Sequence, residues 1–93
     1  MITSREIVDL VKKSIPDAHV EVEDITGMGD HFKIYAVSHV FEGKMLIDQH
    51  RMVQKSLQVA LDDGRIHAIQ IKTEVPAQWA KKRSNEDDFK IIG

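Results

Sequence analysis

The feature that most constrains the fold is a glycine-containing turn between two segments of strand-like sequence. Residues 19–24 alternate polar and aliphatic side chains, a period of two that is typical of a strand with one buried face. Residues 32–37 follow the turn at Gly27–Asp30 and are rich in aromatic and β-branched side chains. The two segments are therefore predicted to pair as a hairpin, with the first strand at a sheet edge and the second more buried.

A first helix is predicted over Ser4–Ser14, before this hairpin. Thr3 and Glu6 have the spacing of a capping box, in which a hydroxyl and a carboxylate three residues later satisfy free N–H groups. Pro16 ends the segment, because proline inside a helix removes a hydrogen bond and clashes with the preceding turn.

A second and longer helix is predicted from Leu46 to Leu61. The evidence is an apolar stripe whose members recur at steps of three and four residues, namely Leu46, His50, Val53, Leu57 and Leu61. Gly64 fits the left-handed position just past the end of such a helix. A buried imidazole needs a hydrogen-bond partner, so His50 is predicted to be a structural residue.

A third strand is predicted over residues 66–72, and a last helix is predicted to begin at Pro76 and to include residues 77–80. The second and third strands, which the long helix joins, are most simply parallel. The predicted fold class is therefore α+β, with a small mixed sheet and helices available to cover one face.

Composition limits the chemistry that is open to this chain. Its 93 residues, 42% hydrophobic and 30% charged, fit one folded domain, and the formal net charge of −2 provides no general attraction for nucleic acid. Because there is no cysteine, any metal ligand must be a histidine or a carboxylate. No apolar run reaches the roughly 20 residues that span a bilayer, so no membrane association and a cytoplasmic location are predicted.

Five histidines are the unusual chemical resource of the chain. His19 and His39 are interpreted as solvated polar residues. His31 ends the glycine-rich turn and His67 lies near the start of the third strand, where a sheet edge could present either imidazole to solvent or to a partner. Neither position by itself specifies a metal site.

The sequence carries no motif of a known class of enzyme. It has no GxSxG nucleophile elbow and no Walker A loop, and the pair Gly27 and Gly29 lacks the third glycine of a dinucleotide site. Asp24, Asp30 and His31 cluster at the turn, where such residues are far more often turn formers than a hydrolytic dyad. The sequence therefore predicts no catalytic residues and no enzymatic activity.

Several segments, in this order along the chain, resemble the BolA family. They are His31–Ser38, Phe41–Lys44, His50–Val53, Arg65–Thr73 and Pro76–Trp79. The resemblance extends to about residue 83, so residues 1–83 are expected to form a single BolA-like domain and residues 84–93 a charged, flexible tail. It implies a fold like the type II KH domain, α-β-β-α-α-β-α, with a three-stranded mixed sheet covered by helices on one side.

The same resemblance implies an adaptor role. Members of the BolA family are partners of monothiol glutaredoxins, with which they form heterodimers that share a [2Fe-2S] cluster in iron delivery or iron sensing. The glutaredoxin cysteine and glutathione hold one iron. The BolA-like chain offers a histidine from the start of its third strand, which is His67 here.

The second ligand implied by the resemblance comes from the loop between the first two strands. The position that carries cysteine in one branch of the family falls near Met28, and His31 is the nearest imidazole. Imidazole is the better ligand for ferric iron, so His31 is preferred over Met28. A cluster is expected only together with glutaredoxin and glutathione, and the isolated chain is expected to be a cofactor-free monomer or weak homodimer.

A KH-like fold also allows a second hypothesis, in which the chain is a transcriptional regulator that binds nucleic acid. A KH module clamps the nucleic-acid backbone with a GxxG loop that carries basic residues. Residues 42–45 offer a single glycine beside an acidic residue, and the net charge is −2. Nucleic-acid binding is therefore the alternative and not the favoured reading.

Overall fold

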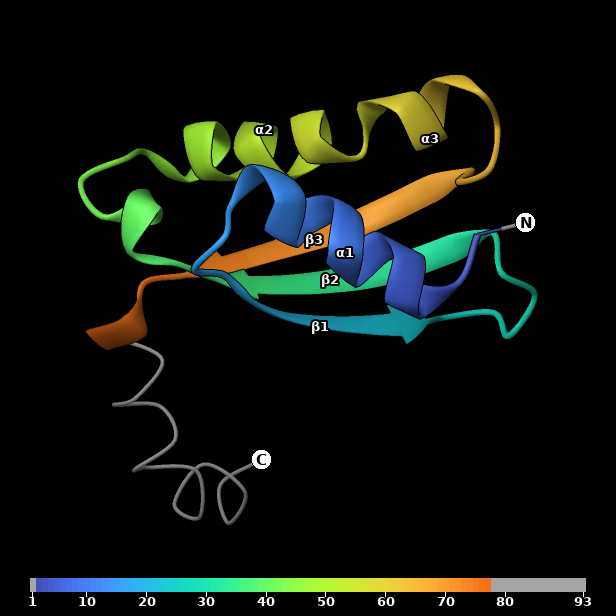
Figure 1. The fold of residues 1–93 in the computed structure, drawn as a ribbon, viewed down its shortest axis with the longest axis horizontal. Coiled ribbons are helices and arrows are strands. Elements are labelled where there is room, and N and C mark those ends of the chain that lie inside the picture. The colour runs from blue at the N-terminus through green and yellow to red at the C-terminus, as the bar shows by residue number, and fades with distance from the viewer. Residues whose placement is uncertain (1, 78–93) are drawn as a thin grey trace, which may run out of the picture.

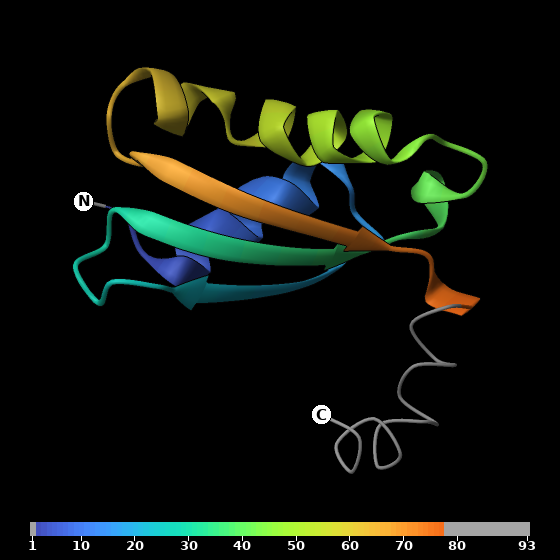
Figure 2. The same cartoon turned by 180° about the vertical axis from the view of Figure 1, so that it is seen from behind.

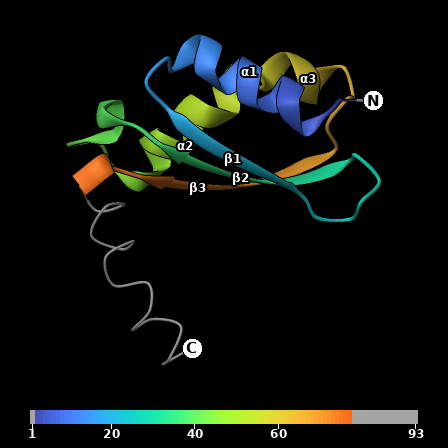
Figure 3. The ribbon, with the colours of Figure 1, turned by 60° about the horizontal axis from the view of Figure 1, so that its bottom comes forward.

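The computed structural model describes residues 2–77 as one layer of helices packed on one face of a sheet (Figure 1). A view along the sheet shows all of the labelled helices on the same side of the strands (Figure 3). The elements are α1 (Ser4–Ser14), β1 (His19–Asp24), β2 (His31–Val37), the 3₁₀ helix η1 (His39–Phe41), α2 (Leu46–Ser56), α3 (Gln58–Asp62) and β3 (Ala68–Glu74). In the part of the chain that the structure describes, no helix has the length and apolar character needed to cross a membrane.

The sheet has three strands in the order β1-β2-β3, so β2 is central, as seen from behind in Figure 2. β1 and β2 are antiparallel, with pairs that run from His19–Val37 to Asp24–Phe32. β2 and β3 are parallel, and their register begins at His31–Ala68. The predicted hairpin, the edge position of the first strand and the parallel pairing of the second and third strands are all confirmed.

The core lies between the helices and the covered face of the sheet. Alternate residues of β2 point into it, whereas Lys33 between them is exposed. This alternation is the period of two expected of a strand with one buried face. The buried cluster consists of Ile2, Ile7, Val11, Ile15, Ala18, Phe32, Ile34, Ala36, Phe41, Val53, Leu57, Ala60 and Ile66.

The first helix begins and ends where the sequence predicts. Thr3 is the N-cap, and its hydroxyl oxygen accepts the N–H of Glu6 at 3.1 Å. The carboxylate of Glu6 contacts the same hydroxyl at 3.3 Å, so the two side chains of the predicted capping box do meet. The helix ends at Ser14, two residues before Pro16.

The prediction of one continuous helix from Leu46 to Leu61 is wrong, because the chain breaks at Leu57 into α2 and α3. The Ser56 hydroxyl donates to the carbonyl of Val53 at 2.5 Å, and the N–H of Leu57 bonds to the carbonyl of Gln54 at 3.0 Å. A serine hydroxyl that competes for a helical carbonyl, with a tightened bond three residues back, is a common cause of a helix bend. The break still leaves Leu57 fully buried.

The buried part of the apolar stripe begins later in α2 than predicted. Val53 and Leu57 are fully buried, but Leu46 is 61% exposed because the first turn of α2 extends beyond the edge of the core. His50 lies between these extremes and is half-buried. Its structural role stays a prediction.

The third strand begins later than predicted, at Ala68, and runs on to Glu74. Ile66 was expected to lie in the strand, but its N–H bonds to the carbonyl of Ala60 at 3.1 Å and its side chain is 1% exposed. It therefore belongs to the packed connection between α3 and β3. The rest of the helix expected from Pro76 and the domain boundary expected near residue 83 lie outside the described residues.

A polar network centred on the buried side chain of Ser38 lies at the end of the sheet where β2 and β3 end, and we call it the Ser38 network. Ser38 is fully buried, and its hydroxyl donates to Asp17 Oδ1 at 2.6 Å. The N–H of His39 donates to Asp17 Oδ2 at 3.0 Å, and the N–H of Ser38 donates to the carbonyl of Glu74 at 3.2 Å. The Ser38 hydroxyl, and then the His39 N–H, lower the pKa of Asp17 below its ordinary value.

Gln49 ties α2 to two other elements at the same end of the molecule. Its side-chain amide donates to the carbonyls of Phe41 at 3.2 Å and Lys44 at 2.9 Å. Its side-chain oxygen accepts the hydroxyl of Thr73 at 2.6 Å. One side chain thus satisfies polar groups of a loop and of β3 together.

Candidate metal-binding site

The two histidines singled out in the sequence lie together at the opposite end of the sheet. The ring centroids of His31 and His67 are 6.4 Å apart, and the ring planes are inclined by 28°. The side chain of His31 is 45% exposed, and His67 is exposed. We call these two residues the histidine pair.

Strand topology explains why the pair forms. Parallel strands begin at the same end of a sheet, and the first residue of β2, His31, is in register with Ala68 of β3. The main-chain carbonyl of Asp30 accepts the N–H of His67 at 3.0 Å and that of Ala68 at 3.3 Å. These bonds hold the residue just before β3 beside the residue that starts β2.

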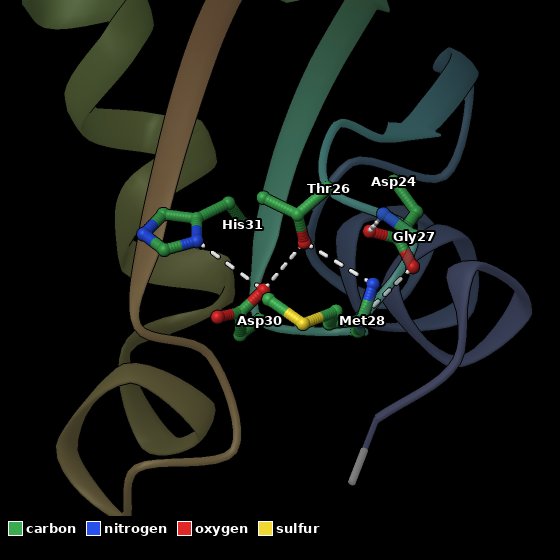
Figure 4. A network of polar contacts seen from close by, with 7 residues as sticks. Asp24, Thr26, Gly27, Met28, Asp30 and His31 are labelled. Atoms are coloured by element: carbon green, nitrogen blue, oxygen red, sulfur yellow. Dashed lines mark hydrogen bonds and ion pairs between the residues drawn. The ribbon is translucent and has the colours of Figure 1, made fainter.

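The turn that leads into His31 is held by a carboxylate (Figure 4). Asp24 accepts the N–H of Gly27 at 3.0 Å and the N–H of Gly29 at 2.9 Å, one with each oxygen. Both glycines have a positive φ, 76° and 73°, which residues with a side chain adopt only at a cost. The glycines therefore allow the turn to fold back onto the end of β1.

A second pair of polar side chains fixes the last residue of the turn. The hydroxyl of Thr26 donates to Asp30 Oδ1 at 2.7 Å and accepts the N–H of Met28 at 3.1 Å. The hydrogen bond from Thr26 is the main cause that lowers the pKa of Asp30; burial opposes it, and the contact with His31 adds a lesser lowering. Asp30 is therefore an anionic acceptor beside the histidine pair.

One nitrogen of His31 faces this carboxylate. Its Nδ1 lies 3.2 Å from Asp30 Oδ1, and this atom has no exposed surface although much of the ring is exposed. The contact is close enough for a hydrogen bond but is not aligned as one in this structure. In Figure 4 the dashed line to Asp30 leaves one edge of the ring, and the other nitrogen lies at the far edge.

Apolar side chains at the turn accompany the histidine pair. Met28 is 65% exposed and Ile25 is 43% exposed. Single exposed apolar residues are normal on a protein surface.

The histidine pair offers part of a metal site. Two imidazoles supply two nitrogen ligands, a type of donor that suits iron, zinc and copper. Among residues 2–77, no group of three or more His, Cys, Asp or Glu side chains is arranged to hold a metal ion. A metal held here would need ligands in addition to these two imidazoles, and Met28 is exposed at the same turn but offers only a thioether.

The other three histidines lie elsewhere. His19 and His39 are exposed, as predicted. His19 contacts Glu21 at 2.7 Å, and His39 lies 3.7 Å from Glu42 at the end of the sheet that holds the Ser38 network. His50 is half-buried on α2. None of them joins the histidine pair.

The sequence interpretation missed Asp30 and Thr26 as partners of the site. It took Asp30 for a turn former, which it is, but not for the neighbour of both histidines. The signal was present in the direct succession of Asp30 and His31, since a carboxylate beside an imidazole commonly orients it. The contact with His67 was not visible, because it depends on the parallel register of β2 and β3.

Comparison with known protein families identifies the family of this chain. The sequence model of the family described as BolA-like protein matches residues 3–78. That match covers most of the chain, so the chain belongs to the BolA-like family.

Individual relatives agree in sequence and in structure. A BolA-like protein of Dictyostelium discoideum is 34% identical over 95 residues, covering 91% of this chain and 83% of that protein. Human (Homo sapiens) BolA-like protein 2 is 40% identical over 75 residues, covering 78% of this chain and 85% of that protein. The structure of a bolA protein homologue from Coxiella burnetii matches with a TM-score of 0.73 at 27% identity, covering 86% of this chain and 99% of that one. The α+β, BolA-like fold class is thus confirmed.

Proposed function

We propose that this chain is a non-enzymatic adaptor that pairs with a monothiol glutaredoxin to share or transfer a [2Fe-2S] cluster. The observation that carries the proposal is the histidine pair, two exposed imidazoles brought to one end of the sheet with ring centroids 6.4 Å apart. Membership of the BolA-like family supports the choice of partner. A cytoplasmic location belongs to the same proposal.

The proposed division of ligands follows from what the chain contains. It has no cysteine, so the thiolates that normally hold iron–sulfur clusters must come from the glutaredoxin and from glutathione. His67 and His31 would supply the nitrogen ligands. Two nitrogen ligands on one iron raise the reduction potential of a [2Fe-2S] cluster relative to a site with cysteines alone.

The protonation state of the two imidazoles then affects how well the complex holds the cluster. Metal ligation needs a deprotonated nitrogen, so acid competes with binding at both histidines. We expect cluster transfer to this chain to weaken as the pH falls, because protons compete with the metal for the imidazole nitrogens.

The direct test is to mix the full chain with a cluster-loaded monothiol glutaredoxin and glutathione. The expected result is a heterodimer on gel filtration and a changed visible circular dichroism spectrum, because imidazole replaces thiolate at one iron. An unchanged spectrum together with no new complex would refute the proposed partnership.

Three alanine variants assign the ligands. His67→Ala and His31→Ala should shorten the lifetime of the cluster in the heterodimer, with the larger loss for His67. His39→Ala is the matched control, because it also removes an exposed imidazole but at the other end of the sheet. If all three variants keep the spectrum and lifetime of the wild type, the histidine pair is not the ligand set.

Nucleic-acid binding remains the alternative, and the structure offers little in its favour. On the face of the sheet away from the helices, Lys33 and Lys72 are interleaved with Glu21 and Glu23 across the strands. Mixed charge of this kind gives no basic track for a phosphate backbone. Binding to an oligonucleotide that weakens steeply with added salt would favour this alternative.

A further inference from the structure

Asp30 touches both members of the histidine pair, through different groups. Its carboxylate Oδ1 lies 3.2 Å from Nδ1 of His31, and its main-chain carbonyl accepts the N–H of His67 at 3.0 Å. The carboxylate is itself held in place by the hydroxyl of Thr26 at 2.7 Å. The position of Asp30 therefore affects the placement of both histidines.

The surroundings of Nδ1 determine which nitrogen of His31 carries the proton. A neutral imidazole has one N–H and one lone pair, on different nitrogens. Nδ1 has no exposed surface and, among the described residues, its near neighbour is the Asp30 carboxylate. A lone pair on Nδ1 would be repelled by the anionic oxygen, whereas an N–H is attracted to it.

We propose that Asp30 is a positioning residue that holds His31 in the tautomer protonated on Nδ1, and so leaves the lone pair of Nε2 available to a metal. In metal sites a histidine ligand almost always donates its second ring N–H to a carboxylate, carbonyl or water, which fixes both tautomer and orientation. The inference rests on the proposed function for the identity of the metal. The tautomer itself belongs to the chain alone.

The same sheet provides an internal reference with the opposite geometry. At His19 the carboxylate of Glu21 lies 2.7 Å from Nε2 instead of Nδ1. The proton of His19 should therefore be on Nε2. Glu21→Gln is a matched control for Asp30→Asn, because each variant neutralises one carboxylate beside an imidazole.

The first experiment is a long-range ¹H–¹⁵N spectrum of the imidazoles of the labelled full chain, at a pH where the histidines are neutral. For the wild type we expect Nδ1 of His31 in the range of protonated nitrogens and Nε2 in the range of unprotonated ones, with the reverse at His19. A wild-type spectrum that shows His31 protonated on Nε2 would overturn the inference without any variant.

The variants then test the cause. The side-chain amide of Asp30→Asn can either donate or accept, so both tautomers of His31 should become populated and its two nitrogen shifts should move toward each other. Glu21→Gln should leave His31 unchanged. Unchanged amide signals of Gly27 and Gly29, which Asp24 holds, would show that the turn is intact. A His31 tautomer that is the same in Asp30→Asn as in the wild type would contradict the assigned role.

A second readout uses the heterodimer with a cluster-loaded glutaredoxin. Loss of a partner to a ligating histidine typically weakens metal binding 10- to 100-fold, so Asp30→Asn should shorten the cluster lifetime at least about tenfold and Glu21→Gln should not. A shifted tautomer with an unchanged lifetime would overturn the positioning role while the adaptor proposal stands. If the wild type takes up no cluster, the adaptor proposal fails, and the tautomer spectra still decide the inference about Asp30.

Discussion

At each end of the sheet a hydroxyl donates a hydrogen bond to a carboxylate, but the two bonds have different roles. At one end the Ser38 hydroxyl donates to Asp17 at 2.6 Å, and at the other the Thr26 hydroxyl donates to Asp30 at 2.7 Å. Ser38 is fully buried and joins residues far apart in the sequence, whereas Thr26 is exposed within a short turn. The bond from Ser38 joins two distant segments of the chain, whereas the bond from Thr26 fixes the Asp30 carboxylate beside the histidine pair.

The burial of the hydroxyl, more than the bond itself, determines how much a carboxylate–hydroxyl contact contributes to stability. A buried hydroxyl that loses its acceptor keeps the full cost of desolvation, but an exposed one exchanges its partner for water. The end with the Ser38 network should therefore carry stability, and the end with the histidine pair should carry function. Variants at the two ends of the sheet test this division.

The largest expected loss of stability comes from Phe41→Ala. Phe41 is fully buried in η1, next to the Ser38 network, and removing a buried aromatic ring typically costs about 3–5 kcal/mol. We expect the midpoint of urea unfolding to fall accordingly, with a slope close to that of the wild type. A loss of less than about 1 kcal/mol would show that this end of the molecule can repack around a cavity.

A smaller loss is expected from Ser38→Ala. It removes the donor to Asp17 and the acceptor for the N–H of Val40, and a lesion of this type costs about 1–3 kcal/mol. The matched variant at the other end is Thr26→Ala, which should change the free energy of unfolding by no more than about 0.5 kcal/mol. Equal losses from the two variants would contradict the division between the ends.

The Ser38 network also predicts that the free energy of unfolding depends on pH in the acidic range. The pKa of Asp17 is lower in the folded protein than its ordinary value of 3.8, so the unfolded chain binds a proton more readily. The stabilisation is therefore present above that ordinary value and is lost as the pH falls through the lowered pKa. Asp17→Asn should lose less stability than the wild type between about pH 5 and pH 2, as followed by thermal unfolding. An unchanged slope in this range would place the acid sensitivity at another carboxylate.

The smallest change in stability is expected from His67→Ala. The side chain is exposed and its main-chain N–H bond to Asp30 is kept, so the free energy of unfolding should stay within about 0.5 kcal/mol of the wild type. The same variant is expected to give the largest effect on cluster lifetime in the heterodimer. A marked loss of stability would mean that this histidine supports the fold.

Local patterns in the sequence were sufficient for most of the fold. Three of these patterns act over only a few residues, and the structure confirms all three. They are the N-cap at Thr3, the alternation of half-buried and exposed residues in β1, and the glycine-containing turn after β1. The break at Leu57 was missed because the bond from Ser56 to a helical carbonyl competes with a strong apolar stripe. The exposure of Leu46 was missed because periodicity shows which face of a helix is apolar but not where the core ends.

The site was only partly accessible from the sequence. Resemblance to the BolA family named His31 and His67, but periodicity and spacing could not show that their rings stack. That proximity is a property of the parallel register of β2 and β3. The role of Asp30 needed coordinates, because it depends on which ring nitrogen the carboxylate faces.

The order of strands also has a consequence for how the protein reaches its working state. β1 and β2 close a short turn, but β3 can pair with β2 only after residues 38–67 have been brought back across the helical layer. Short hairpins form in microseconds, and pairings across long separations form later. A chain arrested with its hairpin alone holds His31 without His67, so the complete pair is offered only by a molecule that has finished folding.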